Sequence, residues 1–280
     1  MKHVKRSTLP GQAGQLAVYD WPMPQRQMRG TVLLVHGLGE HMGRYAEVAQ
    51  LLNDWGFAVR GYDHQGHGHS EGRRGTLHSP DGFLQDLATV IDDTRDHHGA
   101  RDAPLILLGH SMGGLVVART LAEQLLPVDA AVLSSPALGA FPTFFQNLLL
   151  ASLPRVAPHL RVDNGLKTDF VSRDPDVVKA YKADPLVHRR ISAGLAAWIL
   201  KNGSQTLADA AHWSVPTLLL YAGQDRLVNA QASADFAHAA PKDVVQAQCF
   251  EGMYHEIFND LYRVQVFTAL KRWLLARFSV

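Results

Sequence analysis

The feature that most constrains this chain is a Gly-His-Ser-Met-Gly turn at residues 109–113, placed directly between a strand pattern and a helix pattern. Four aliphatic residues, 105–108, precede the turn, and an apolar helix-like run, 115–122, follows it. Glycines on both sides of Ser111 leave no side chains to collide where a strand turns sharply into a helix. The turn therefore predicts a strained, exposed Ser111, with the first amides of the helix aimed at any oxyanion that forms beside it.

Composition is that of an ordinary globular chain of one or two domains. Of its 280 residues, 46% are hydrophobic and 19% are charged. Lys and Arg number 27 against 26 Asp and Glu, so no net field favours nucleic acid, and we expect no nucleic-acid partner. Composition and charge do not indicate an oligomeric state.

Cysteine use and hydropathy point to the cytoplasm. Cys249 is the only cysteine, which excludes an internal disulfide and fits a reducing compartment. The first residues are charged without an apolar segment behind them, and no apolar run approaches ~18 residues. We expect a cytoplasmic protein that contacts membranes only peripherally.

Strand and helix patterns alternate along most of the chain. After an edge strand at 15–21, strands are expected at 31–35, 57–63, 105–108, 130–134, 217–221 and 244–250, and helices at 45–55, 83–96, 112–122, 230–239 and 261–278. Continuous β-branched and aliphatic strands are typical of a sheet that is buried on both faces. The pattern predicts an α/β fold with a doubly wound, mostly parallel sheet.

One interval in this alternation is too long. Roughly 80 residues separate the strands at 130–134 and 217–221, where a helix and two loops need about 20–25. We predict a helical cap, or lid, at 136–213, inserted into a core formed by 1–135 and 214–280. Its nearly uncharged stretch, 141–153, is expected to form the mouth of an apolar tunnel and a transient contact with a membrane or micelle, through Phe144, Phe145 and Leu149. The alternative is a core helix that never meets ligand.

A base and an acid for the serine follow later in the chain. Asp225 comes just after one expected strand and His255 just after the next, so both should lie at the sheet edge where Ser111 emerges. The order Ser, Asp, His is that of α/β-hydrolases. We therefore predict a triad in which His255 takes the proton of Ser111 and Asp225 orients His255. Glu256 and Asp260, the rival carboxylates, are expected to be solvated surface charges.

An oxyanion needs two donors. The backbone N–H groups of Met112, directly after the nucleophile, and of Leu38, in a His-Gly-Leu-Gly turn after the first parallel strand, are the candidates. Among rival histidines, His36 suits a loop-bracing role, and His110 is next to the serine but its side chain is expected to point away from the line of attack.

A second His-rich loop leaves an alternative open. Residues 63–72 read Asp-His-Gln-Gly-His-Gly-His-Ser-Glu-Gly, and His64, His67 and His69 could converge as zinc ligands. The residues alone do not exclude this reading.

Four motifs together resemble the monoacylglycerol lipase and lysophospholipase family of α/β-hydrolase serine hydrolases. They are the stretches 36–45, 63–72, 109–114 and 252–256, and Asp184-Pro185-Leu186 extends the resemblance weakly into the cap. The resemblance implies that the His-rich loop is structural rather than metal-binding, and that no metal or other cofactor is used. It also implies an apolar acyl tunnel in the cap and a polar end, near Glu40, Arg44 and Tyr181, that receives glycerol.

The expected activity is hydrolysis of the carboxylic ester of a monoacylglycerol, a small lipid, to glycerol and free fatty acid through an acyl-enzyme. The alternatives within enzymes are a lysophospholipase or a general carboxylesterase. Outside enzymes, the alternative is a ligand receptor on the same fold.

Overall fold

The computed structural model describes residues 4–21, 28–97, 103–139 and 157–278. Within them, an eight-stranded sheet has the order β1-β2-β4-β3-β5-β6-β9-β10, in which β4 to β10 run parallel and β1 and β2 are antiparallel additions. The strands are β1 Lys5–Gly11, β2 Gly14–Trp21, β3 Gly30–Val35, β4 Phe57–Tyr62, β5 Leu105–His110, β6 Ala130–Ser134, β9 Thr217–Ala222 and β10 Val245–Phe250.

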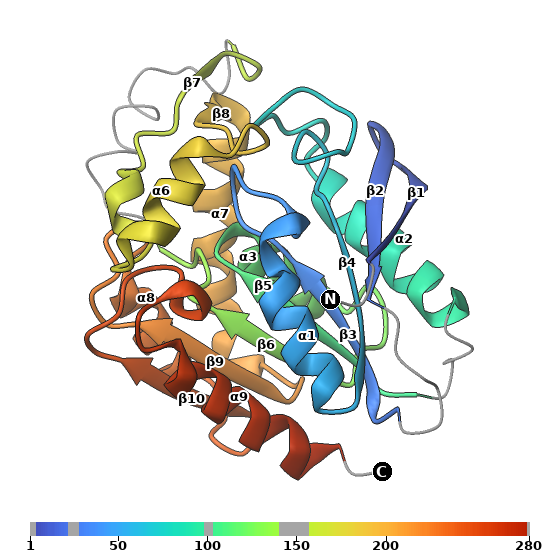
Figure 1. Cartoon of the computed structure of the whole chain (residues 1–280), viewed down its shortest axis with the longest axis vertical. Coiled ribbons are helices and arrows are strands. Elements are labelled where there is room, and N and C mark those ends of the chain that lie inside the picture. Colours follow the sequence, from blue (N-terminus) through green and yellow to red (C-terminus); the bar gives the residue numbers. More distant parts are fainter. Residues whose placement is uncertain (1–3, 22–27, 98–102, 140–156, 279–280) are drawn as a thin grey trace.

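Helices cover both faces of the sheet (Figure 1). On one face lie α1 Ala46–Asp54 and α9 Arg263–Arg277, and on the other lie α2 Gly82–His97, α3 Met112–Ala122, α7 Ala193–Asp209 and α8 Ala230–Ala239. Strand side chains alternate between the layers: in β3, Val32 and Leu34 pack with α1 and α9, whereas Leu33 and Val35 pack with α2 and α3. The predicted doubly wound α/β-hydrolase fold is confirmed.

The edge of the sheet differs from the prediction. Residues 14–21 do not form the edge strand, because β1 pairs with β2 along its whole length from Lys5↔Asp20 to Gly11↔Gly14. The β1 side chains are mostly exposed, and Pro10 lies within the strand. An exposed strand of this kind lacks the apolar alternation by which strands are found in a sequence.

Between β6 and β9 the structure describes an inserted region, residues 157–212. It contains a two-stranded antiparallel sheet, β7 Arg161–Asp163 and β8 Arg190–Ser192, followed by α7, with α6 Pro175–Ala183 between the two strands. Helix α7 packs on α3, so this part of the region joins the main apolar core. The boundaries 135/136 and 213/214 stay a prediction.

The predicted tunnel mouth lies outside the described residues. Phe144, Phe145 and Leu149, with the rest of 141–153, belong to that part, and their membrane contact stays a prediction. Among the helices that the structure describes, none has the length and apolar character needed to span a bilayer.

Candidate active site

Ser111 lies where β5 ends and α3 begins, in a backbone conformation that side chains seldom adopt. Its φ is 53° and its ψ is −120°. A Cβ at position 113 would lie 2.2 Å from the Val35 carbonyl oxygen, and one at position 109 would lie 2.6 Å from the Gly113 carbonyl oxygen. Only glycine fits at both flanks, because strand and helix backbones approach too closely for a side chain.

The structure brings the three predicted triad residues together. Asp225 follows β9 and His255 follows β10, so both reach the carboxyl edge of the sheet where β5 delivers Ser111. His255 Nδ1 donates to Asp225 Oδ2 at 2.6 Å, since an ionised carboxylate can only accept. His255 Nε2 is then the acceptor for the Ser111 hydroxyl, at 2.9 Å. This is the geometry required for proton transfer from serine to histidine.

The surroundings of the imidazole favour its charged form. Burial by itself disfavours the imidazolium, but the Asp225 carboxylate and, further away, Glu256 and Glu40 raise the pKa of His255 above its ordinary value. Asp225 is itself held by the amides of Leu227 (2.8 Å) and Val228 (3.0 Å), which bind its other oxygen. The acid is thereby fixed in the orientation that His255 needs.

The prediction that Glu256 and Asp260 are solvated surface charges is wrong. Glu256 is 5% exposed and Asp260 is fully buried. Each carboxylate is paired with an arginine: Glu256 with Arg44, at 2.6 and 2.8 Å, and Asp260 with Arg173, at 2.5 and 3.1 Å. Buried carboxylates of this kind are tolerated because a guanidinium neutralises them.

Leu38 and Met112, the two residues whose amides are predicted to form the oxyanion hole, both line the pocket of Ser111. Within the described residues, neither Leu38 N–H nor Met112 N–H has a hydrogen-bond acceptor. The Met112 amide is the first of α3, where N–H groups have no partner inside the helix. Both donors are therefore available to an oxygen bound next to the serine.

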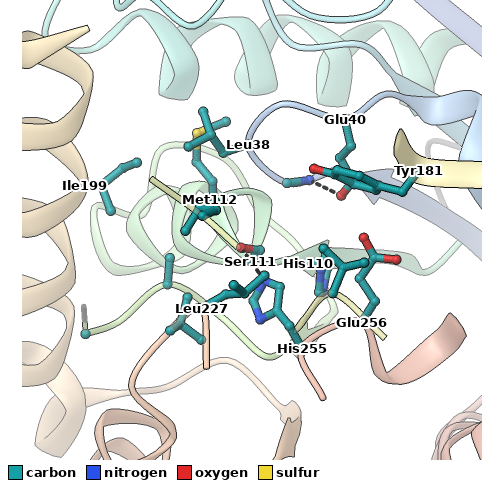
Figure 2. A pocket seen from close by; sticks show the side chains of 16 residues that line it. Leu38, Glu40, His110, Ser111, Met112, Tyr181, Ile199, Leu227, His255 and Glu256 are labelled. Atoms are coloured by element: carbon teal, nitrogen blue, oxygen red, sulfur yellow. Dashed lines mark hydrogen bonds between the residues drawn. The ribbon is translucent and has the colours of Figure 1, made fainter. Parts of the chain in front are cut away.

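Ser111 opens into a pocket with about 640 Å³ of empty space, part of it continuous with solvent. Figure 2 shows that apolar side chains lie on one side of Ser111 and His255 and polar ones on the other. The apolar wall consists of Leu38, Met112, Ala137, Leu166, Val171, Ile199, Leu227 and Val228, and the polar end consists of Glu40, His110, Tyr181 and Glu256. The inserted region contributes to both sides.

A hydrogen-bonded cluster, Glu40–Arg44–Glu256 with Tyr45, forms the polar end. Arg44 binds Glu40 at 2.7 Å and both oxygens of Glu256, and Tyr45 OH donates to Glu40 at 2.8 Å. Burial opposes ionisation of Glu40, but Arg44, together with His110, His36 and the hydrogen bond from the Gly37 amide, outweighs burial and lowers the pKa of that carboxyl. In turn, the two carboxylates raise the pKa of Arg44 despite burial. The charges of this cluster are therefore fixed.

The predicted glycerol-binding residues occupy different positions. Glu40 and Tyr181 line the pocket, whereas Arg44 lies behind them, below the Tyr181 ring at 4.6 Å from its centroid. Arg44 thus holds the two carboxylates and does not face the pocket of Ser111.

His110, expected only to point away from the line of attack, is part of the site. Its ring lines the pocket and packs against the His255 ring, with centroids 4.7 Å apart. His110 Nδ1 lies 3.1 Å from the Ser134 carbonyl oxygen, and burial and His255 lower the pKa of His110 to about 4. It is a neutral side chain between the triad and the polar end. Its place directly before the nucleophile was the signal that could have identified it.

The His-rich loop is organised around Asp63. Asp63 accepts hydrogen bonds from Tyr19 OH (2.8 Å), Met42 N (2.7 Å) and His69 N (2.8 Å). His36 Nε2 accepts from the amide of His64 at 2.9 Å, so His36 braces this loop against the loop that carries Leu38.

His64 and His67 are fully buried, and burial lowers the pKa of each well below its ordinary value, whereas His69 is exposed. In the described ranges, no three His, Cys, Asp or Glu side chains are grouped to hold a metal ion.

Comparison with known proteins extends over nearly the whole chain. The family described as "Serine aminopeptidase, S33" matches residues 26–262. The chain is 36% identical to a monoacylglycerol lipase of Mycolicibacterium smegmatis over 95% of each protein, and 32% identical to "Phospholipase YtpA" of Bacillus subtilis, over 90% of this chain and 97% of that one.

Solved structures of monoacylglycerol and monoglyceride lipases are also similar to this chain. The monoacylglycerol lipase of Paleococcus ferrophilus is 34% identical, covers 98% of this chain and 99% of its own, and superimposes with a TM-score of 0.81. A soluble variant of the Saccharomyces cerevisiae monoglyceride lipase, in complex with a substrate analog, has the same fold at 20% identity, with a TM-score of 0.90 over 99% and 96% of the two chains. The family resemblance predicted from the four motifs is confirmed.

Proposed function

The chain belongs to the serine aminopeptidase S33 family of α/β-hydrolases, and from that premise we propose that it hydrolyses monoacylglycerols to glycerol and free fatty acid. The observation that carries this proposal is the position of Ser111 at the junction between an apolar wall and a polar end of one pocket. A single acyl chain fits the apolar wall, and a small hydroxylated alcohol fits the polar end.

In the first half of the reaction, the Ser111 oxygen attacks the ester carbonyl carbon while His255 Nε2 takes the hydroxyl proton. The Leu38 and Met112 amides bind the oxygen that becomes negative. When the carbon–oxygen bond to glycerol breaks, the proton on His255 passes to the leaving oxygen. Asp225 stabilises the imidazolium throughout and keeps it in the correct tautomer.

In the second half, water attacks the acyl-enzyme. His255 takes a proton from the water as its oxygen binds the acyl carbon, and returns it to the Ser111 oxygen as the fatty acid leaves. The same two amides serve the second oxyanion. No group beyond the triad and these amides is needed for either half.

The polar end favours a neutral alcohol over a charged one. Glu40 and Glu256 carry two negative charges and Arg44 carries one positive charge, so one negative charge remains next to the alcohol side of the pocket. Hydroxyl groups donate to carboxylates, whereas a phosphate oxygen is repelled by them. Glycerol therefore suits this end better than the phosphate-bearing head of a lysophospholipid.

A lysophospholipase remains the second candidate, because one relative is named a phospholipase. A panel of monoacylglycerols and lysophospholipids with matched acyl chains separates the two. We expect kcat/KM to be at least about 10-fold higher for the monoacylglycerols, since one unfavourable charge contact of ~1.4 kcal/mol has that effect. Equal or higher values for lysophospholipids would replace the proposal.

Labelling by a fluorophosphonate tests the mechanism independently of the substrate. Rapid, stoichiometric labelling that is lost in Ser111→Ala is expected of a serine hydrolase. A ligand receptor on this fold would react slowly or not at all, even when it binds the same lipids.

A further inference from the structure

Residues 36–41, here called the oxyanion loop, contact a turn of the inserted region, residues 184–188, here called the cap turn. The backbone N–H of His188 donates to the Gly39 carbonyl oxygen at 2.9 Å. The side chains of His41 and Asp184 are joined by a second hydrogen bond, also of 2.9 Å. Both bonds join segments that are more than 140 positions apart in the chain.

The hydrogen-bond pattern fixes the tautomer of His41. Its Nδ1 accepts the Gly43 amide at 3.2 Å, so the proton is on Nε2, which donates to Asp184 Oδ2. The other oxygen of Asp184 accepts the Leu186 amide at 2.8 Å. Asp184 thus connects the backbone of the cap turn to the start of the short helix Met42–Tyr45, which follows the oxyanion loop.

Leu38 lies between Gly37 and Gly39, and the backbone of each of these glycines is hydrogen-bonded. The Gly37 amide donates to Glu40 Oε1 at 2.7 Å, and the Gly39 carbonyl oxygen accepts from the His188 amide. Gly39 has a φ of +78°, and a Cβ there would lie only 2.4 Å from the His188 carbonyl oxygen. The cap turn is therefore packed directly on the loop backbone, at the residue next to Leu38.

We propose that Asp184 and His41 are positioning residues for catalysis, because their hydrogen bond holds the cap turn on the oxyanion loop and thereby aims the Leu38 N–H at the developing oxyanion. Neither side chain lines the pocket of Ser111, so each acts through the loop and not on the substrate. The proposal rests on the serine mechanism given above, but not on the identity of the ester.

The central test replaces Asp184 by Ala and compares ground-state with transition-state binding. We expect kcat on a short, soluble ester to fall about 10–100-fold, less than the ~10²–10³-fold that removal of a whole oxyanion donor costs. Affinity for a trifluoromethyl ketone, which forms a tetrahedral adduct with Ser111, should fall in parallel. Affinity for an uncleavable 1-O-alkylglycerol ether should change less than about 2-fold, because the ether forms no oxyanion.

Two further variants separate positioning from general stability. Asp184→Asn keeps one acceptor oxygen, for His41, but turns its NH2 group towards the Leu186 amide, so kcat should lie between that of the unchanged protein and that of Asp184→Ala. Asp169→Ala breaks an exposed ion pair with Lys182 (2.6 Å) in the same inserted region and should leave kcat unchanged, as expected for a surface pair.

A double-mutant cycle tests whether Asp184 and His41 act through one hydrogen bond. If the two side chains act through one bond, His41→Ala and the double variant should each lose about as much kcat as Asp184→Ala. Losses that multiply, an unchanged kcat in a folded Asp184→Ala, or an equal loss of affinity for the ether would overturn the proposal. Where Asp184→Ala does not fold, His41→Ala and Asp184→Asn decide the question with the same inhibitors. Failure of the monoacylglycerol panel would overturn the proposed substrate and leave this result intact.

Discussion

Two buried hydrogen-bonded clusters share one pocket, and they differ in whether they can change protonation. The triad pairs one carboxylate with one imidazole, and the pKa of His255 is raised from a value already near neutrality. The polar cluster pairs two carboxylates with one guanidinium, which lowers the pKa of Glu40 and raises that of Arg44. Both clusters are buried, so the difference in protonation behaviour comes from the groups that are paired. The triad can move a proton, whereas the polar cluster keeps its charges.

His110 separates the two clusters. Its ring lies against His255, it lines the pocket at the polar end, and its pKa is lowered to about 4. A neutral imidazole at this place transmits no charge of its own between the clusters. The charge-holding part therefore acts on His255 through the charges of Glu256 and Glu40, which raise its pKa, and not through a charge on His110.

The largest effect should come from the proton-moving cluster. Ser111→Ala and His255→Ala should each lower kcat about 10⁴-fold or more, because the hydroxyl and its base act as one unit. The double variant should be little worse than either single variant. Burst and steady-state kinetics on a chromogenic ester measure this, and losses that multiply would contradict the 2.9 Å hydrogen bond as the catalytic link.

Asp225→Asn should lower kcat about 10²–10⁴-fold with an unchanged melting temperature, because an amide in place of the carboxylate disturbs the tautomer of His255. Asp260→Asn is the matched control, since this buried carboxylate pairs with Arg173 and not with a histidine. A larger catalytic loss in Asp260→Asn than in Asp225→Asn would show that the acid has been misassigned.

Mutation of the polar cluster, Glu40–Arg44–Glu256, should lower the stability of the fold. Arg44→Ala leaves Glu40 and Glu256 buried without their cation, and we expect a loss of about 3–5 kcal/mol in the free energy of unfolding at pH 7. Denaturant unfolding measures it. Since the pKa of Glu40 is lowered in the folded state, the Arg44 contribution is present at neutral pH and is lost as pH falls through the folded pKa. The deficit of the variant should shrink in acid.

An exposed pair is the control for that experiment. Arg189→Ala breaks the contact with Asp163 (3.1 Å), in which both side chains are more than half exposed, and it should change the stability by less than about 1 kcal/mol. A similar loss in Arg44→Ala and Arg189→Ala would mean that the buried cluster carries no special charge compensation.

The smallest effect concerns the acid limb of the pH profile. Because the neutral base is required and its pKa is raised, kcat/KM should fall as pH drops through a value above the ordinary 6.5 of histidine. Glu256→Gln removes a negative charge that raises this pKa, so the acid limb should move to lower pH. A limb that stays in place would show that His110 and the solvent screen the two clusters completely.

What the sequence predicted well was set by local pattern. Strands such as Leu105–His110 are continuous aliphatic runs, and the positions of Asp225 and His255 follow once each strand is placed, because parallel strands end at one edge. The exposed strand β1 has no such pattern, which is why residues 15–21 were expected at the edge of the sheet.

The failures concern contacts between distant residues. Glu256 and Asp260 look like surface charges in isolation, and their burial depends on arginines 212 and 87 positions away. Arg44 was expected to receive glycerol, and its guanidinium instead binds Glu40, four positions before it, and Glu256, 212 positions after it; the second pairing is not visible in the sequence near position 44. Pairing of this kind is decided by the packing of the insert and loops, not by local pattern.

The backbone of Ser111 has a consequence for how this protein can evolve. A conformation with φ of 53° and ψ of −120° costs a non-glycine residue on the order of 1–3 kcal/mol, and glycine adopts it without a Cβ penalty. The residue that would be most stable at this position is therefore one that cannot react. Selection for stability and selection for turnover therefore favour different amino acids at position 111. A substitution of Ser111 by glycine would give a more stable fold that has lost its nucleophile.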